Sequence, residues 1–189
     1  MARFNRRFRA VWRETSVNGL SVDIKFKTIL WNQYGAALDM LGDAIRLCPE
    51  HLWTAVLWKD VDDPRRGQYW FVAYHTLFWV DLYLTGKREG FAPPAPFVRG
   101  KLPEQPYTRD QILAYLDACC KKVQATIEAL TDEKAQAECV FGWIRASYLE
   151  MQLYAMRHVQ EHAGQLSLTL GQHDVAGLDW VTQARGSAA

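Results

Sequence analysis

The sequence predicts an all-α protein folded as a four-helix bundle. Four segments of the 189-residue chain carry apolar side chains at spacings of three and four residues, the pattern of an amphipathic helix. No segment shows sustained alternation of apolar and polar residues, so we expect no sheet. A long proline-rich connection separates the second segment from the third and is long enough to carry the chain the full height of a bundle.

The first helix is expected over residues 21–48 and the second over residues 68–85. Pro49 ends the first, because the residue before a proline disfavours helical backbone. Gly86 follows the second as a C-cap, a position that favours glycine. The two apolar stripes contain Ile29, Leu30, Gln33, Ala37, Leu38, Leu41, Ile45 and Cys48, and then Phe71, Tyr74, His75, Phe78, Trp79 and Leu82.

The third helix opens with a sequence of capping-box form, Thr108-Arg109-Asp110-Gln111. The fourth is expected from near Gly142 to Leu170. The connection over residues 86–107 holds five prolines, so the second and third helices are expected to lie parallel in an up-down-down-up topology.

We therefore expect a basic N-terminal extension over residues 1–20, a bundle over residues 21–171 and a C-terminal tail over residues 172–189. In the tail, Leu178 and Trp180 are candidates to dock on the bundle.

Composition excludes several classes of protein. The formal net charge is +1, so general electrostatic binding of nucleic acid is not expected, although five arginines precede the first acidic residue. The Arg6-Arg7 pair lacks the apolar segment of an export signal, and no run is long and apolar enough to cross a membrane. The four cysteines form no Cys-x-x-Cys pair, which favours free thiols in a reducing cytoplasm.

The chemistry of the chain is concentrated in its histidines. His158 and His162 are four residues apart, so on a helix they share one face, and both fall on the apolar stripe of the fourth helix. His75 falls on the stripe of the second helix. Three imidazoles with an open position for water or a thiolate form the pattern of a catalytic zinc, nickel or iron site. Gln165, on the same stripe, is a candidate to orient a ligand or bind substrate.

Other interpretations of these residues are weaker or remain open. The histidines are alternatively core residues hydrogen-bonded to neighbours. Val159 follows the first histidine where zinc proteases carry glutamate, and no glutamate stands three residues before either histidine, as a di-iron bundle requires. Asp81 lies off the His75 face. The remaining candidates for metal ligands or general bases are weaker. His51 and His173 are expected to be exposed, and Glu150 and Glu161 lie off the histidine face.

The segment His158-Val-Gln-Glu-His162-Ala-Gly164-Gln165-Leu166 resembles the H-x-x-x-H-x-G-Q-[LI] signature of DinB-like (YfiT-like) proteins. Trp70-Phe71-Val72-Ala73-Tyr74-His75 is similar to that family's single histidine on helix two, and Cys48-Pro49-Glu50-His51-Leu52-Trp53 to its segment after helix one. The resemblance implies a four-helix bundle that binds a divalent metal through His75, His158 and His162. The metal is expected to be nickel or zinc, with iron or manganese as alternatives, and the protein a homodimer.

The resemblance also implies an activity. Characterised relatives include S-transferases that use low-molecular-weight thiols such as bacillithiol or mycothiol, and a mycothiol-dependent maleylpyruvate isomerase. We therefore expect a cytoplasmic metal-dependent transferase or hydrolase acting on a small molecule, with a metal-bound water or thiolate as the reactive group. Two alternatives remain: a non-catalytic metal- or ligand-binding protein of a stress response, and a structural bundle whose histidines fill the core.

Overall fold

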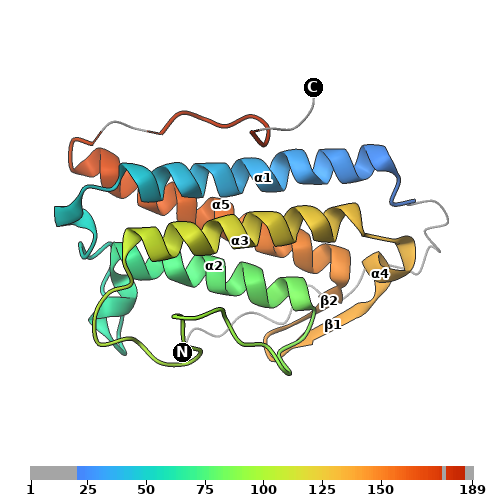
Figure 1. Ribbon diagram of the computed structural model, residues 1–189, viewed down its shortest axis with the longest axis horizontal. Coiled ribbons are helices and arrows are strands. Elements are labelled where there is room, and N and C mark those ends of the chain that lie inside the picture. The colour runs from blue at the N-terminus through green and yellow to red at the C-terminus, as the bar shows by residue number, and fades with distance from the viewer. Residues whose placement is uncertain (1–20, 176–177, 186–189) are drawn as a thin grey trace, which may run out of the picture.

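The computed structural model describes residues 21–175 and 178–185, and four long helices make up most of this part of the chain (Figure 1). They are α1 (Ile24–Leu47), α2 (Tyr69–Thr85), α3 (Arg109–Glu128) and α5 (Tyr148–Gln172). Three of them lie close to the ranges expected from sequence. The predicted basic extension, residues 1–20, lies outside the described residues.

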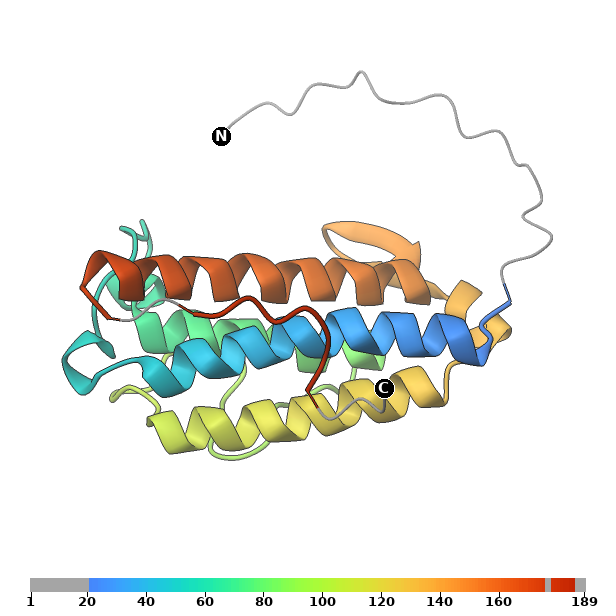
Figure 2. The ribbon, with the colours of Figure 1, turned by 90° about the horizontal axis from the view of Figure 1, so that it is seen from above.

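The four long helices lie side by side and bury one apolar core (Figures 1 and 2). α1 packs against α3 and α5, and α2 packs against the same two helices. The colour gradient shows that α1 and α5 run in one direction and α2 and α3 in the other. No helix among the described residues combines the length and the apolar character that a membrane crossing requires.

Local signals explain where these helices begin and end. The side chain of Asp23 accepts a hydrogen bond from the Phe26 N–H at the start of α1. The predicted capping box is present at the start of α3, where Thr108 and Gln111 each bond the other's backbone N–H. Gly86 ends α2 with a φ of 74°, in the left-handed region that favours glycine.

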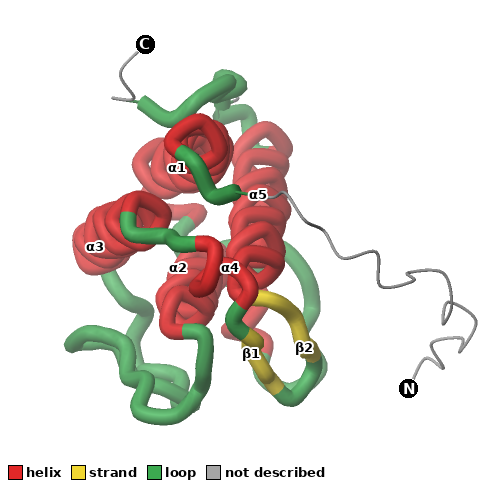
Figure 3. Tube along the Cα trace, turned by 90° about the vertical axis from the view of Figure 1, so that its right-hand side faces the viewer, coloured by secondary structure: helices red, strands yellow, loops and turns green. Residues whose placement is uncertain are grey.

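The expectation of no sheet is wrong, and so is the expected start of the fourth helix. Residues 138–147 form an antiparallel hairpin of β1 (Glu138–Phe141) and β2 (Ile144–Ser147), which lies beside α4 (Asp132–Gln136) and the start of α5 (Figure 3). Each strand has only four residues, too few for an alternating pattern to stand out from the helical spacing that follows. The Ser147 hydroxyl accepts a hydrogen bond from the Glu150 N–H and caps the start of α5. The helix therefore begins at Tyr148, six residues after the expected start near Gly142.

Two irregular segments are held against the bundle. In the crossover between α2 and α3, the Val98 N–H donates to the Tyr107 hydroxyl and the Val98 carbonyl accepts from the Tyr74 hydroxyl, each at 3.2 Å. In the C-terminal segment, the Ala184 N–H donates to the Asn32 carbonyl of α1. Leu178 packs on the core as expected, but Trp180 is 69% exposed and does not.

Candidate metal centre

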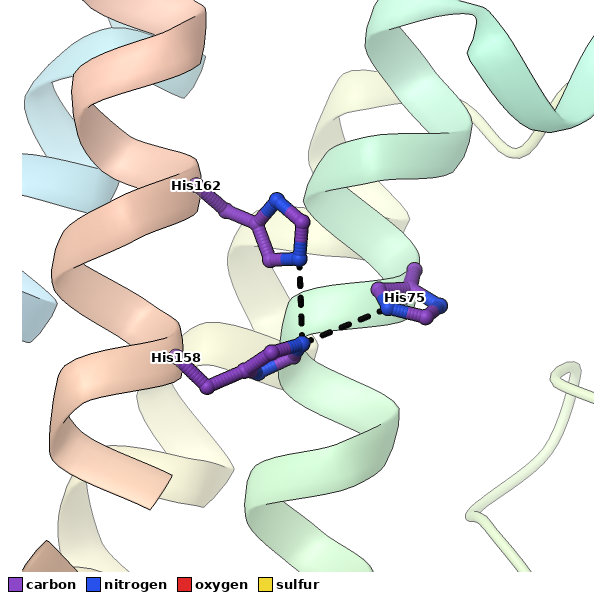
Figure 4. Close-up of side chains that lie close together, drawn as sticks. All are labelled: His75, His158 and His162. Carbon is purple, nitrogen blue, oxygen red and sulfur yellow. Dashed lines mark hydrogen bonds between the residues drawn. The ribbon is translucent and has the colours of Figure 1, made fainter. Parts of the chain in front are cut away.

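Three histidines from two helices converge at one point in the bundle. His158 and His162 project from α5 toward His75 on α2, as Figure 4 shows. The Nε2 atom of His158 lies 3.3 Å from Nε2 of His75 and 3.0 Å from Nε2 of His162. The three residues form the cluster of potential metal ligands found among the described residues, with one ligand atom of each within 4.8 Å of the others.

The spacing of these nitrogens suits a metal ion. Zinc–nitrogen bonds of about 2.0–2.1 Å in tetrahedral geometry place two ligand nitrogens roughly 3.3–3.4 Å apart. The two observed separations, 3.3 and 3.0 Å, are close to that value. One ion would therefore reach all three rings with only small side-chain movements.

Burial keeps the three imidazoles neutral. Desolvation, with a smaller contribution from neighbouring histidines, lowers the pKa of His75 to about 3 and that of His158 to about 3. Burial also lowers the pKa of His162, against a hydrogen bond to Gln165 that raises it. Neutral imidazole is the form that donates a lone pair to a metal, so the three rings carry no positive charge that would repel an ion near neutral pH.

The outer nitrogens of the rings have different partners. His162 Nδ1 lies 2.7 Å from the Gln165 side-chain oxygen and donates its proton there, which leaves the lone pair on Nε2. The indole N–H of Trp79 donates to His75 Nδ1 at 3.2 Å, so the proton of neutral His75 lies on Nε2. His158 Nδ1 is buried without a hydrogen-bond partner.

These partners show why the cluster favours a cation. The Nε2–H of His75 donates to His158 Nε2, which therefore carries no proton. His162 Nε2 carries none either, and the two bare nitrogens lie 3.0 Å apart. Two lone pairs at that separation repel each other unless a cation lies between them, so the donor set fits a divalent metal.

A cavity of about 410 Å³ opens beside two of the three histidines, His75 and His162. Its walls are largely aromatic, and Trp58 stacks on the His162 ring at a centroid distance of 6.5 Å. Charged side chains are also present on its lining, which comprises Trp58, Asp60, Arg66, Phe71, Val72, Tyr74, His75, Phe78, Trp79, Val98, Gly100, Lys101, Leu102 and His162. The volume suits a small organic molecule.

The other predicted groups lie apart from this cluster. His51, His173, Glu150 and Glu161 are all exposed, as expected for the two histidines. Gln165 contacts His162 rather than the cavity wall, so its contact with a substrate stays a prediction. The four cysteines are free, and burial raises the pKa of Cys48 to about 12 and that of Cys120 to about 11, which makes both poor nucleophiles.

Asp81 also lies outside the histidine cluster. Only 2% of it is exposed, and its carboxylate accepts hydrogen bonds from the Tyr115 hydroxyl and the Lys122 ammonium group. It therefore joins α2 to α3 rather than facing the metal ligands. Sequence reasoning set Asp81 aside as a ligand but did not find this network.

Sequence reasoning placed Trp79 on the stripe of the second helix without giving it a role, and it missed the wall residues Trp58 and Lys101. Trp79 had a detectable signal, since it stands four residues after His75 and therefore on the same helix face. Trp58 and Lys101 lie on irregular segments, where no periodic pattern indicates which side chains reach the cavity.

Comparison with known proteins agrees with this architecture. The solved structure of a DinB-like protein, YjoA of Bacillus subtilis, superposes with a TM-score of 0.56 at 14% sequence identity, over 83% of this chain and 99% of that one. No curated protein matches the chain. A sequence model of the DinB superfamily matches residues 61–166, a span that includes all three clustered histidines. This match covers more than half of the sequence, and the chain belongs to the DinB superfamily.

Proposed function

We propose that this protein is a divalent-metal-dependent enzyme of the thiol S-transferase type, built as an up-down-down-up four-helix bundle. His75, His158 and His162 are the proposed ligands, and zinc or nickel the proposed metal. The observation that carries the proposal is the convergence of three neutral imidazoles, two of which line a cavity. Members of this superfamily are often metal-binding proteins, which supports the same assignment.

A bound divalent ion supplies Lewis acidity, which favours the ionised form of a thiol or of water near neutral pH. The histidines add no negative charge, so they do not offset the charge of the ion. Within residues 21–175 and 178–185, the ligand cluster contains no carboxylate. Gln165 fixes the orientation of the His162 ring, and the aromatic walls limit the access of water to the same point.

The nucleophile is proposed to come from outside the chain. Cys48, Cys119 and Cys139 are buried, and burial raises the pKa of all four cysteine thiols. None of the four lines the cavity. A small thiol that enters the cavity therefore supplies the sulfur, which favours transfer to an external thiol over a mechanism with an enzyme-bound cysteine.

The test combines metal analysis with a transfer assay. The full chain is loaded with zinc or nickel, freed of excess ion, and its metal content measured by elemental analysis. Bacillithiol and mycothiol are then offered with monochlorobimane. The thiol sulfur bonds to the chloromethyl carbon, chloride leaves, and the thiol proton passes to solvent, giving a fluorescent conjugate.

We expect about one metal per chain and metal-dependent turnover in the unaltered protein. His158→Ala should lose both, whereas His173→Ala, which alters an exposed histidine, should keep both. Equal turnover by metal-free and loaded protein would contradict the mechanism. Stable metal binding without turnover of any thiol would instead identify a non-catalytic metal-binding protein.

Two further parts of the proposal concern cellular location and oligomeric state. We propose that the protein acts in the cytoplasm as a homodimer. Light scattering on the purified full chain tests the oligomeric state, and a monomer at micromolar concentration would contradict it.

A further inference from the structure

One wall of the cavity is formed by residues of the crossover between α2 and α3. Val98, Gly100, Lys101 and Leu102 all contribute to it. This wall carries a positive charge, because it includes Lys101, an exposed lysine.

The backbone that carries Lys101 is held in place. Both backbone polar groups of Val98 bond to tyrosine hydroxyls, and the guanidinium of Arg99 donates to the carbonyls of Arg88 and Phe91. Gly100 has a φ of 76°, a conformation that glycine adopts without strain. Lys101 therefore projects from an anchored segment rather than from a loose loop.

The other charged groups of the cavity already have partners. The Asp60 carboxylate accepts hydrogen bonds from the backbone N–H groups of Asp62 and Asp63, at 3.0 and 3.1 Å. Arg66 pairs with the Asp62 carboxylate at 3.2 Å. Lys101, by contrast, has no carboxylate within ion-pairing distance in the part of the chain that the structure describes.

The uncharged walls favour a flat ligand. Phe71, Tyr74, Phe78 and Trp79 line the cavity from α2, and Trp58 lines it beside His162. Aromatic faces and edges gain most from packing against another ring. Among the described residues, the cavity lining contains two cations, Arg66 and Lys101, and one anion, Asp60, and only Arg66 has an ion-pair partner. Aromatic walls beside the unpaired Lys101 favour an aromatic anion.

We propose that the cavity binds a flat aromatic carboxylate, with the carboxylate paired to Lys101 and the opposite end of the ring facing His75 and His162. The proposal rests on the proposed function only for the reaction of the bound ligand near the histidines. The pairing with Lys101 stands independently of any metal.

The test uses 2-naphthoate and its neutral counterpart 2-naphthamide as probes. Binding of each to the full chain, both metal-loaded and metal-stripped, is measured by calorimetry. Because ion pairs with exposed lysines are modest, we expect the metal-stripped protein to prefer the acid by about fivefold, less at high salt. Lys101→Met should abolish this preference. Lys25→Met, which removes an exposed lysine of α1 outside the cavity lining, should retain it.

Equal binding of acid and amide by the unaltered metal-stripped protein would overturn the proposal, as would a preference that survives in Lys101→Met. These outcomes are separate from failure of the proposed function. A protein that binds no metal or transfers no thiol would still show the Lys101-dependent preference, and a protein that lacks this preference could still transfer thiols.

Discussion

Acid should destabilise the metal-free protein through its buried histidines. The pKa of His75 and of His158 is lowered from the usual 6.5 to about 3 in the folded protein, chiefly by burial. In the unfolded chain both rings return to the usual value. Between about pH 6.5 and pH 3 the unfolded chain therefore binds more protons than the folded one, and stability falls as the pH falls through that window.

The size of this effect follows from the shifts. Each pH unit inside the window costs about 1.4 kcal/mol per histidine. At pH 6.5 half of the unfolded rings are already protonated, so acidification from about pH 6.5 to pH 5 removes about 3 kcal/mol through the two rings. Typical domains have only about 5–15 kcal/mol of stability, so the loss is a large fraction of the total.

Urea unfolding at the two pH values, followed by circular dichroism, measures the loss. The His75→Gln/His158→Gln double variant removes both titrating rings and should lose about 3 kcal/mol less on acidification than the unaltered chain. A control with His51→Gln and His173→Gln changes two exposed histidines and should behave like the unaltered chain. If the first double variant loses as much stability as the unaltered protein, the reasoning about buried neutral imidazoles is wrong.

Three further substitutions probe separate features. Trp79→Phe removes the indole N–H that donates to Nδ1 of His75. A ring that binds metal through Nε2 carries its proton on Nδ1, so this donor opposes metal binding, and metal affinity measured by chelator competition should rise by about fivefold, the contribution of one hydrogen bond. Weaker metal binding by the variant would contradict this. Asp81→Ala leaves two donors without their acceptor and should cost about 2–3 kcal/mol in urea unfolding, and a loss below about 0.5 kcal/mol would show that the buried network stabilises little. Gly35→Ala places a Cβ atom in steric overlap with the Cβ of Ala184, so tryptic cleavage of the C-terminal segment should accelerate while the bundle stays folded. An unchanged cleavage rate would show that this segment is not held there.

Periodicity was enough to predict the long helices and to bring the histidines together. The four-residue spacing of His158 and His162 places them on one face of α5 whatever the rest of the fold does. His75 could be added because apolar stripes of neighbouring helices face each other, and the contact of α2 with α5 provides this.

Other features depend on contacts that no local pattern encodes. The hairpin of residues 138–147 is too short to show a period, and part of its sequence continues the helical spacing of α5. The cavity is built from α2, from the loop that contains Trp58 and from the crossover that contains Lys101. Which side chains of those two irregular segments face inward is decided by tertiary hydrogen bonds, such as those made by Tyr74 and Tyr107.

The origin of the three histidines in only two helices has a consequence for biosynthesis. His75 and His158 are 83 residues apart in the chain, and α5 leaves the ribosome after α1, α2 and α3. A nascent chain that has already formed α1, α2 and α3 still carries a single histidine of the set. High-affinity loading of metal therefore has to wait until α5 docks, and the metal would then link α5 to α2, which is made earlier.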